Sequence, residues 1–422
     1  MRSTVLFRLS QWRPSLAISV WLLGLTQIIG YGTLYYGFAP LAEDIAASFR
    51  WPVFWIFGAF SLALLTSGLI APLVGRRVDR HGAAQVMAVG SVSAAASLVW
   101  TALAPNPSFF FAGLVAMQLA STLVFYDAAF AQLVQKGGPS SGRLITLLTL
   151  IAGFASTIFW PLTVSLKAWF SWREIFLIFA GLNLAICAPT HFWLTRQHAH
   201  SISSTDPHDG KAVPIDVKNG SLPPELRPRA MFLVTWGFAL TGFLLMAILA
   251  QMVPLLTAMG LGSFSVVVSA LFGPSQVVIR FANMTLGSGR HPLHVTLAMA
   301  VLLPVAALVL ALSAPSVAGA AVFASILGFA SGLRSIVQGT LPLALFGPTG
   351  YAARLGRMAA VRLLLGAIAP FVLAYLMQLF GPSAALLLIS SAGVLGLAAF
   401  AEIARLNRFG VSARAPSQSH AE

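Results

Sequence analysis

The stretch Gly75-Arg76-Arg77-Val78-Asp79-Arg80-His81-Gly82 is a short charged segment between two long apolar runs of the chain. Its glycines permit a tight turn, because glycine adopts backbone conformations that other residues avoid. The carboxylate of Asp79 can accept hydrogen bonds from the exposed amides at the start of a helix. The stretch therefore predicts a loop between two helices that turn back sharply, with an acidic side chain available to a third helix.

The composition indicates that these helices cross a membrane. Hydrophobic residues make up 58% of the 422 residues and charged residues only 9%, and the mean hydropathy is +0.86. A soluble chain of this length would need more charge to cover its surface. The net charge of +14 does not indicate nucleic acid, because the basic residues fall singly or in small groups between apolar runs. We expect a lipid bilayer as the partner and no nucleic acid.

Twelve apolar runs are long enough to cross a bilayer, since about twenty residues span its core as a helix. The predicted fold class is an all-α polytopic membrane protein with two six-helix pseudo-repeats. Its domains would be a tail at 1–14, a bundle at 15–195, a polar linker at 196–229, a bundle at 230–405 and a tail at 406–422. The predicted spans are roughly 15–38, 52–74, 84–104, 108–132, 143–166, 174–195, 231–256, 264–287, 292–313, 317–340, 357–379 and 383–404.

The basic residues also indicate the orientation. With the N-terminus in the cytoplasm, only Arg50, Lys167 and Arg173 of the 25 lysines and arginines fall in predicted outer loops. Cytoplasmic loops of membrane proteins are rich in such residues, so we expect both termini in the cytoplasm. The apolar run after Ser15 is too long for a signal peptide, and we interpret it as the first span.

A weak internal repeat connects the two halves of the chain. Arg80-His81 follows the second predicted span, and Arg290-His291 follows the eighth, 210 positions later. Gly137 and Gly347 repeat the same offset after the fourth and tenth spans. Two parallel six-helix repeats are a pattern of transporters whose binding site lies between the repeats.

The stretch from Gly75 to Gly82 resembles the G-x-x-x-D-R-x-G signature loop of the major facilitator superfamily, in its residues and in its place after the second span. The resemblance covers about residues 15–405 and implies a secondary transporter that works by alternating access. It also implies that Asp79, with Arg80 in the same network, binds the start of the eleventh span on the cytoplasmic side. Arg77 stands in place of the family's leucine, and Ala83 in place of its usual basic residue.

Five further stretches resemble a group of bacterial inner-membrane facilitators: Thr26 to Gly32, Tyr126 to Phe130, Gly153 to Pro161, Gly273 to Arg280 and Gly339 to Arg357. That group includes arsenite-type efflux carriers. The resemblance implies a location in the bacterial inner membrane and proton-coupled efflux of a small solute, with a metalloid as one candidate.

Polar residues recur at helical spacing on several predicted spans, so each of these spans has one polar face. Because lipid does not tolerate such faces, they line a central cavity or form hydrogen bonds with other helices. The candidate cavity residues are Gln27, Tyr31 and Tyr35 on the first span, Gln118, Thr122 and Tyr126 on the fourth, Gln276 and Arg280 on the eighth, and Arg334 and Gln338 on the tenth.

Arg280 and Arg334 lie within apolar runs, and no Asp or Glu occurs between Ala230 and Phe400. Asp127 is the only acid well inside a predicted span, so we expect it to pair with one of the two arginines. Such a pair predicts a gate, a proton carrier or a static bridge. The other arginine would then be available to a bound anion, since a guanidinium is suited to carboxylates and oxyanions.

Two solute classes follow from these observations. The arginines favour an organic anion or monocarboxylate, whereas arsenite is mostly uncharged at neutral pH. The sequence has no nucleotide-binding loop, no metal-ligand spacing and no Ser/His/Asp set within the spans. We therefore expect a monomeric carrier of a small molecule, with no cofactor, no bound metal and no enzymatic activity. A non-transporting membrane sensor is the remaining alternative.

Overall fold

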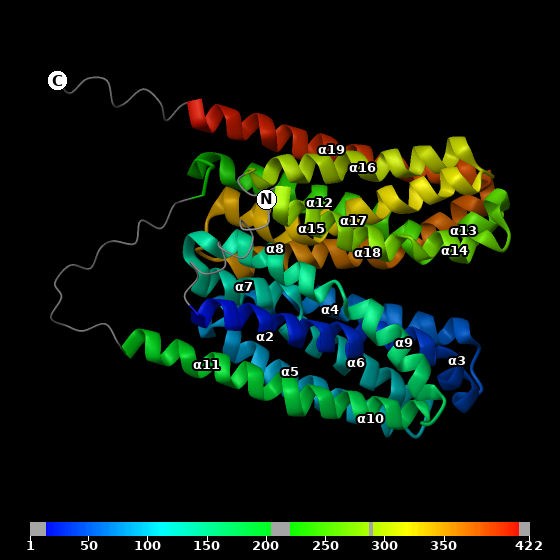
Figure 1. The fold of residues 1–422 in the computed structure, drawn as a ribbon, viewed down its shortest axis with the longest axis horizontal. Helices are drawn as coiled ribbons and strands as arrows, with labels where there is room; N and C mark the ends of the chain where they lie inside the picture. The colour runs from blue at the N-terminus through cyan, green and yellow to red at the C-terminus, as the bar shows by residue number, and fades with distance from the viewer. Residues whose placement is uncertain (1–13, 204–219, 287–289, 413–422) are drawn as a thin grey trace. The chain divides into compact units, whose positions relative to one another are not determined.

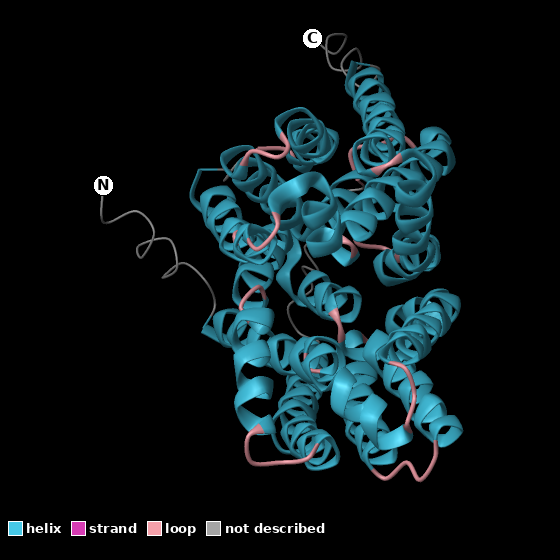
Figure 2. Ribbon diagram, turned by 90° about the vertical axis from the view of Figure 1, so that its right-hand side faces the viewer, coloured by secondary structure: helices cyan, strands magenta, loops and turns pink. Residues whose placement is uncertain are grey.

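The computed structural model describes residues 14–203, 220–286 and 290–412, and every regular element in these ranges is a helix (Figure 1, Figure 2). Eleven helical segments are long and apolar enough to cross a membrane, and one of them, Pro107–Lys167, has 61 residues. As one straight helix it would be about 90 Å long, three times the thickness of the hydrocarbon core. It turns at Gly138, whose φ of 50° favours glycine, and so contains two predicted spans. The all-α class is confirmed, and the helices are consistent with twelve crossings.

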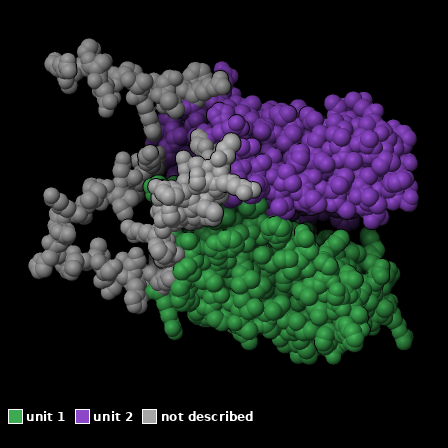
Figure 3. All heavy atoms as spheres, viewed as in Figure 1, with its two compact units in different colours: residues 1–217, 352–356 green, residues 218–351, 357–422 purple. Residues whose placement is uncertain are grey.

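Contacts between helices divide the chain into two compact units, which Figure 3 shows in different colours. Unit 1 comprises Met1–Val217 together with Ala352–Gly356. Unit 2 comprises Lys218–Tyr351 together with Arg357–Glu422. Part of the predicted linker at 196–229 lies outside the described residues.

In unit 1, α5 has α6, α10 and α11 as neighbours, and α2 packs against α8 (Figure 1). The elements of this unit are α2 (Pro14–Tyr31), η1 (Gly32–Tyr36), α3 (Phe38–Phe49), α4 (Val53–His81), α5 (Ala83–Ala102), α6 (Pro107–Val124), α7 (Tyr126–Gly137), η2 (Gly138–Ser140), α8 (Ser141–Ala152), α9 (Ala155–Lys167), α10 (Trp172–Leu182), η3 (Asn183–Cys187) and α11 (Ala188–Ser203).

In unit 2, α16 packs against α17 and α19, and α12 packs against α19. The elements are η4 (Pro224–Leu226), α12 (Arg227–Ala250), α13 (Met252–Leu256), η5 (Thr257–Leu261), α14 (Phe264–Ala270), α15 (Phe272–Leu286), α16 (Pro292–Ser313), α17 (Val317–Phe346), α18 (Tyr351–Phe380) and α19 (Pro382–Ser412). The first residues of α18 count with unit 1.

Corresponding spans pack together in the two units. The second span packs on the fourth as α4 on α6, and the eighth on the tenth as α15 on α17. The third packs on the fourth as α5 on α6, and the ninth on the tenth as α16 on α17. This shared pattern of neighbours agrees with the weak sequence repeat, because repeated halves bury the same faces of their helices.

Some helices extend beyond the spans predicted from hydropathy. The first span was predicted to end near residue 38, but α3 continues the same helical segment to Phe49. α3 buries Leu41, Ala42 and Ile45, which lie on one face at helical spacing, while Glu43 on another face is exposed. The predicted boundary is wrong because an amphipathic helix continues where mean hydropathy has already fallen.

Candidate functional site

Four predicted spans of unit 1 are interrupted near their middle. The first changes from α2 to the π-helical turn η1 at Gly32, and the sixth changes from α10 to the π-helical turn η3 at Asn183. The fourth breaks at Phe125, and the fifth breaks at Gly153. Phe125 has an extended backbone, with φ −74° and ψ −173°. At membrane depth, non-helical backbone is tolerated only where protein buries it or where it lines a water-filled cavity. These interruptions therefore mark the region of unit 1 where a site is expected.

Gln27 and Gln118, two of the predicted cavity residues, hold the interruptions by hydrogen bonds. Gln27 on α2 donates from Nε2 to the carbonyl oxygen of Val124, beside the break in the fourth span, at 2.6 Å. Gln118 on α6 donates from Nε2 to the carbonyl oxygen of Leu34, within η1, at 3.1 Å. The two side chains are 1% and 0% exposed. The sequence left two roles open for these residues, cavity lining and hydrogen bonding between helices. Their side-chain amide nitrogens form hydrogen bonds between helices.

Aromatic rings gather at the same interruptions. The ring of Tyr31 stacks on Phe125 with centroids 4.0 Å apart and lies 4.8 Å from the ring of Tyr126. Tyr126 in turn stacks on the buried Phe130 at 5.1 Å. Tyr31 and Tyr126 keep part of their surface accessible, and hydroxyls are disfavoured against lipid. The structure therefore brings these two predicted cavity residues together.

The other candidates from the first and fourth spans are less tightly grouped. The ring of Tyr35 lies 5.2 Å from that of Tyr36 and 5.9 Å from that of Phe60. Thr122 donates to the carbonyl oxygen of Leu119 in its own helix at 2.7 Å. For the hydroxyl of Thr122, the observed bond is a local one, as is common for threonine in apolar helices.

Asp127 lies in the first turn of α7, directly after the break at Phe125. Its side chain is half-buried. A carboxylate in this position is stabilised by the positive end of the helix dipole. The predicted pairing of Asp127 with Arg280 or Arg334 joins residues of different units, and it stays a prediction.

In unit 2, Arg334 on α17 is only 6% exposed. Its Nη1 donates to Oγ1 of Thr241 at 3.1 Å, and its Nη2 donates to the carbonyl oxygen of Phe238 at 3.0 Å. The guanidinium carbon also lies 5.7 Å from the centroid of the Phe238 ring. A side chain at Gly242 would collide with the guanidinium, so glycine at this position makes room for it. These neighbours orient the charge of Arg334 without neutralising it.

The other polar candidates of unit 2 lie on α15 and α17, which pack against each other. Arg280, also 6% exposed, donates from Nη2 to Oε1 of Gln276 at 3.0 Å. Gln338 is half-buried and follows Arg334 by one helical turn. Gly332 on α17 lies against the backbone of Gln276, where a Cβ would be too close. The candidates of the eighth and tenth spans are thereby placed on two closely packed helices.

The stretch that was predicted as a loop is mostly helical. α4 continues to His81, and only Gly82, with φ 85°, leaves the helix. The loop prediction is wrong for Gly75 to His81, because the charged residues of this stretch form the last turns of α4 instead of ending the helix. Gln135 on α7 fixes the turn: its Nε2 donates to Val78 O at 3.3 Å, and its Oε1 accepts from the Ala83 amide at 2.9 Å.

Asp79 caps the start of α18, the helix of the eleventh predicted span. Its two carboxylate oxygens accept from the amides of Ala352 at 3.0 Å and Ala353 at 2.8 Å. α18 follows Gly350 and has no side-chain cap from its own sequence, so Asp79 satisfies amides that would otherwise lack a partner. Gly75 permits the approach, because a Cβ there would collide with the Ala352 carbonyl. Arg80 is exposed, and its part in the network stays a prediction.

Sequence reasoning missed a buried polar junction of three helices in unit 1. His191 on α11 is 1% exposed. Its Nδ1 lies 2.7 Å from Oγ of Ser91 on α5, and its Nε2 lies 3.1 Å from Oγ1 of Thr26 on α2. A histidine inside an apolar predicted span was the signal available in the sequence, but the partners come from distant parts of the chain.

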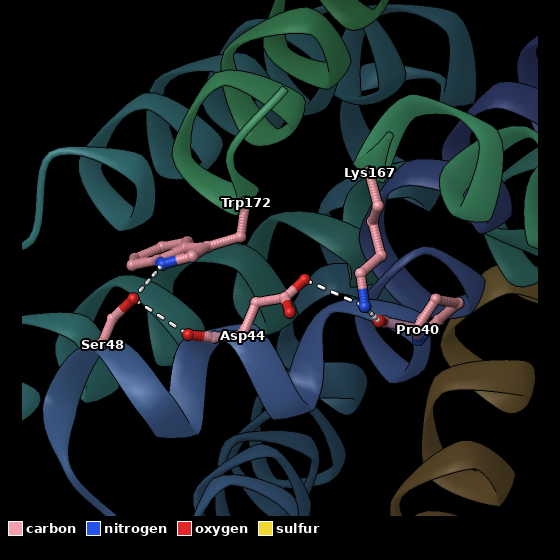
Figure 4. A network of polar contacts seen from close by, with 5 residues as sticks. All are labelled: Pro40, Asp44, Ser48, Lys167 and Trp172. Atoms are coloured by element: carbon pink, nitrogen blue, oxygen red, sulfur yellow. Dashed lines mark hydrogen bonds and ion pairs between the residues drawn. The ribbon is translucent and has the colours of Figure 1, made fainter. Parts of the chain in front are cut away.

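Sequence reasoning also missed a second network, which joins α3 to the end of α9 and the start of α10 (Figure 4). Lys167, at the end of α9, forms an ion pair with Asp44 on α3 at 2.9 Å and donates to the carbonyl oxygen of Pro40 at 2.9 Å. Trp172 Nε1 donates to Ser48 Oγ at 2.8 Å and ties α10 to the same end of α3. In the sequence, Lys167 was informative only as a basic residue of an outer loop.

The described part of the chain offers no evident metal site. It contains no group of three or more His, Cys, Asp or Glu side chains arranged to hold a metal ion. Cys187 is buried and has no disulfide partner in the described residues.

The comparisons with known proteins agree with this architecture. The sequence profile described as Major Facilitator Superfamily matches residues 20–333. The human organic anion transporter MFSD10 (TETRAN) has a similar structure, with a TM-score of 0.71 and 16% identity over 92% of this chain and 100% of that chain. The transporter FucP of the same superfamily, in its outward conformation, is similar with a TM-score of 0.65 and 16% identity over 94% and 99% of the two chains. No curated protein matches the sequence.

Proposed function

Because the chain belongs to the major facilitator superfamily, we propose that this multi-pass membrane transporter carries a small organic anion by alternating access. The observation that carries the choice of solute is the buried Arg334, whose hydrogen-bond acceptors in unit 2 are neutral oxygens. The only acids among the described residues of that unit are Glu225 and Glu402. A buried guanidinium needs a counter-charge, and a carboxylate matches its geometry.

The proposed lining of the solute path combines partly accessible polar residues with the two buried arginines of unit 2. Tyr31, Tyr35 and Tyr126 would contribute hydroxyls and ring faces from unit 1. Arg280, Arg334 and Gln338 would contribute donors from unit 2. The structural similarity to the human organic anion transporter MFSD10 is compatible with this proposal.

Asp127 is proposed as the group that couples transport to protons or gates the path. Its place at the start of α7, partly accessible, supports either role. Asp127→Asn should abolish accumulation driven by a pH gradient and leave counterflow exchange intact, as expected for the loss of a proton site. Unchanged driven transport would eliminate the carrier role.

The proposed location is the bacterial inner membrane with both termini in the cytoplasm, and the proposed direction is efflux. These proposals derive from the distribution of basic residues and from the family resemblance. Efflux of arsenite is the second solute proposal, but a mostly uncharged solute leaves the buried charge of Arg334 without a function. A non-transporting sensor would show no flux at all.

Flux into proteoliposomes tests the function directly, with benzoate as the anionic probe and arsenite as the uncharged probe. We expect wild-type flux of benzoate above that of empty vesicles. Arg334→Ala should reduce benzoate flux by about 30-fold or more, because removing one partner of a buried charge pair costs at least about 2 kcal/mol. The control is Arg229→Ala, which removes an exposed guanidinium that pairs with Glu402 at 2.7 Å. Arsenite flux without benzoate flux would refute the choice of an anion.

A further inference from the structure

Gln27 and Gln118 form a reciprocal arrangement that the family relationship does not assign. Each glutamine is on one interrupted span and donates to a carbonyl at the interruption of the other span. Gln27 lies on α2, before the π-helical turn η1, and reaches Val124 at the end of α6. Gln118 lies on α6, before the break, and reaches Leu34 in η1. The two interruptions are thus cross-linked by two hydrogen bonds rather than supported separately.

The carbonyl of Val124 needs a partner because the break removes its regular one. The amides of Ala128 and Ala129 both donate to Phe125 O, at 3.1 Å each, and α7 therefore begins anew at Tyr126. In η1 the helical ladder is also irregular, since the amide of Gly37 donates to Gly32 O, five residues earlier. A backbone carbonyl left without a donor at membrane depth is costly, so the glutamine amides stabilise both interruptions.

Burial excludes these two side chains from direct contact with a solute in the observed state. Both are at most 1% exposed, whereas Tyr31, Tyr126 and Asp127 around them are partly accessible. The break held by Gln27 immediately precedes Tyr126 and Asp127. A shift of Val124 or Phe125 would therefore move the first turn of α7, which carries both residues.

We infer that Gln27 and Gln118 are positioning residues, which join the interruptions of the first and fourth spans into one joint and so hold the first turn of α7 in place. The joint couples the two interruptions: loosening either one loosens the other. This inference goes beyond the proposed function, and it concerns unit 1 alone.

Hydrogen–deuterium exchange of the purified full-length protein in detergent tests the inference without any solute. Gln27→Met and Gln118→Met keep the side-chain length and helix propensity but remove the amide donor. We expect each single variant to speed exchange about threefold to tenfold in both peptides, 32–38 and 124–130, the range that corresponds to one hydrogen bond between membrane helices. In the double variant, the fold-increase in exchange rate should be much smaller than the product of the two single-variant fold-increases, because the two hydrogen bonds belong to one joint.

Gln132→Met is the matched control. Gln132 is also buried and lies on α7 in the same unit, but its Nε2 has no hydrogen-bond partner among the described residues. We expect it to change exchange in neither peptide. Faster exchange confined to the peptide that contains the broken bond, or independent effects in the double variant, would overturn the coupling. No change in either single variant would overturn the positioning role.

Benzoate flux distinguishes positioning from solute contact. A positioning role predicts that turnover per folded transporter falls in Gln27→Met while the half-saturating benzoate concentration stays within about twofold, because no solute contact is lost. A raised half-saturating concentration with unchanged turnover would instead identify Gln27 as a solute ligand and refute the inference. If the wild type carries no benzoate, the proposed function fails, whereas the exchange experiment still decides whether the joint exists.

Discussion

Unit 1 and unit 2 share a pattern of helix packing but differ in how they place polar groups inside the membrane. Unit 1 interrupts the first, fourth, fifth and sixth spans, and glutamine, threonine and histidine side chains satisfy the resulting or neighbouring polar groups. In unit 2, α16, α17, α18 and α19 are each 22 to 31 residues long and have no comparable break. That unit instead buries the guanidinium groups of Arg280 and Arg334.

The difference indicates a division of roles. Neutral hydrogen bonds between membrane helices are individually weak, so a unit built on interruptions is suited to bending. The continuous helix α17 holds Arg334 at a defined depth, which is compatible with the proposed recognition of an anion. The interruptions at the seventh and eighth spans, at Gln251 and Leu271, show that unit 2 is not uniformly rigid.

The largest effect is expected from Gly32→Ala in the π-helical turn of unit 1. A Cβ at Gly32 would overlap the ring of Phe159 on α9, and overpacking of this kind costs about 1–3 kcal/mol. The thermal stability of the purified protein should fall, and Phe159→Leu in the same chain should restore most of it. Gly58→Ala is the control, because no atom lies within 4 Å of the added Cβ. Equal losses at Gly32 and Gly58 would contradict a special role of the interruption.

Gly242→Ala tests whether unit 2 recognises an anion through the position of Arg334. The added Cβ would meet Nη2, the far end of a flexible side chain, so the fold should tolerate it while the guanidinium moves. Benzoate affinity should fall about tenfold, equivalent to about 1.4 kcal/mol, with little change in melting temperature. Gly366→Ala, where the nearest atom is Met246 Cγ at 3.6 Å, provides the comparison. Unchanged benzoate affinity in Gly242→Ala would argue against Arg334 as the anion ligand.

Asp79→Asn tests a helix start in unit 1 that is capped from outside that helix's own sequence. Replacing the carboxylate removes the charge and one acceptor from the amides of Ala352 and Ala353, a loss of about 1 kcal/mol for a helix cap. Amide exchange in a peptide covering 350–356 should become several-fold faster. The exposed Glu43 offers a control, since Glu43→Gln removes an acid of the same unit without removing a cap. Unaltered exchange at 350–356 would show that the cap contributes little.

The smallest effect is expected at His291, which caps α16 in unit 2. Its Nδ1 accepts from the Leu293 amide at 3.2 Å, and burial, together with the neighbouring His294, lowers the pKa of His291 below its usual value of 6.5. Because the pKa is lower in the folded state, the stabilisation is fully present above about pH 6.5 and is lost as the pH falls through the folded pKa. The loss should stay below about 1 kcal/mol.

His291→Asn keeps a capping oxygen that does not titrate. Thermal melts at pH 7.5 and pH 5 should therefore differ less for this variant than for the wild type. The same pH dependence in both proteins would assign the effect to other groups.

The fold could largely be predicted from the sequence, because crossing a membrane constrains helix length and hydropathy very strongly. The end of the first span could not be predicted in this way. In α3, buried Leu41 and Ile45 lie close in sequence to the exposed Glu43, so the mean hydropathy of the segment is too low to indicate a membrane helix. The signature stretch identified the superfamily correctly, yet its residues up to His81 proved to be helix. Charged residues at a membrane surface permit both conformations, and local sequence does not distinguish them.

The candidate site was predictable only in residue type. Helical spacing placed Gln27, Gln118 and Tyr31 in one class of polar residue, but their environments in the structure differ. The side-chain amides of Gln27 and Gln118 are buried and donate to backbone carbonyls, whereas the ring of Tyr31 is partly accessible. The sequence did not predict the contacts of His191 with Ser91 and Thr26, because they join positions 100 and 165 residues apart. Spacing within one helix carries no information about such contacts.

The sequence alone determined that this protein is an all-helical membrane carrier built from two related halves, because hydropathy, basic residues and one signature stretch are local properties. Tertiary structure alone decided which polar groups are satisfied by protein and which stay accessible. The physical reason is that a hydrogen bond such as Gln27 to Val124 depends on where two distant helices are interrupted and how closely they pack. Both are set by the fold as a whole.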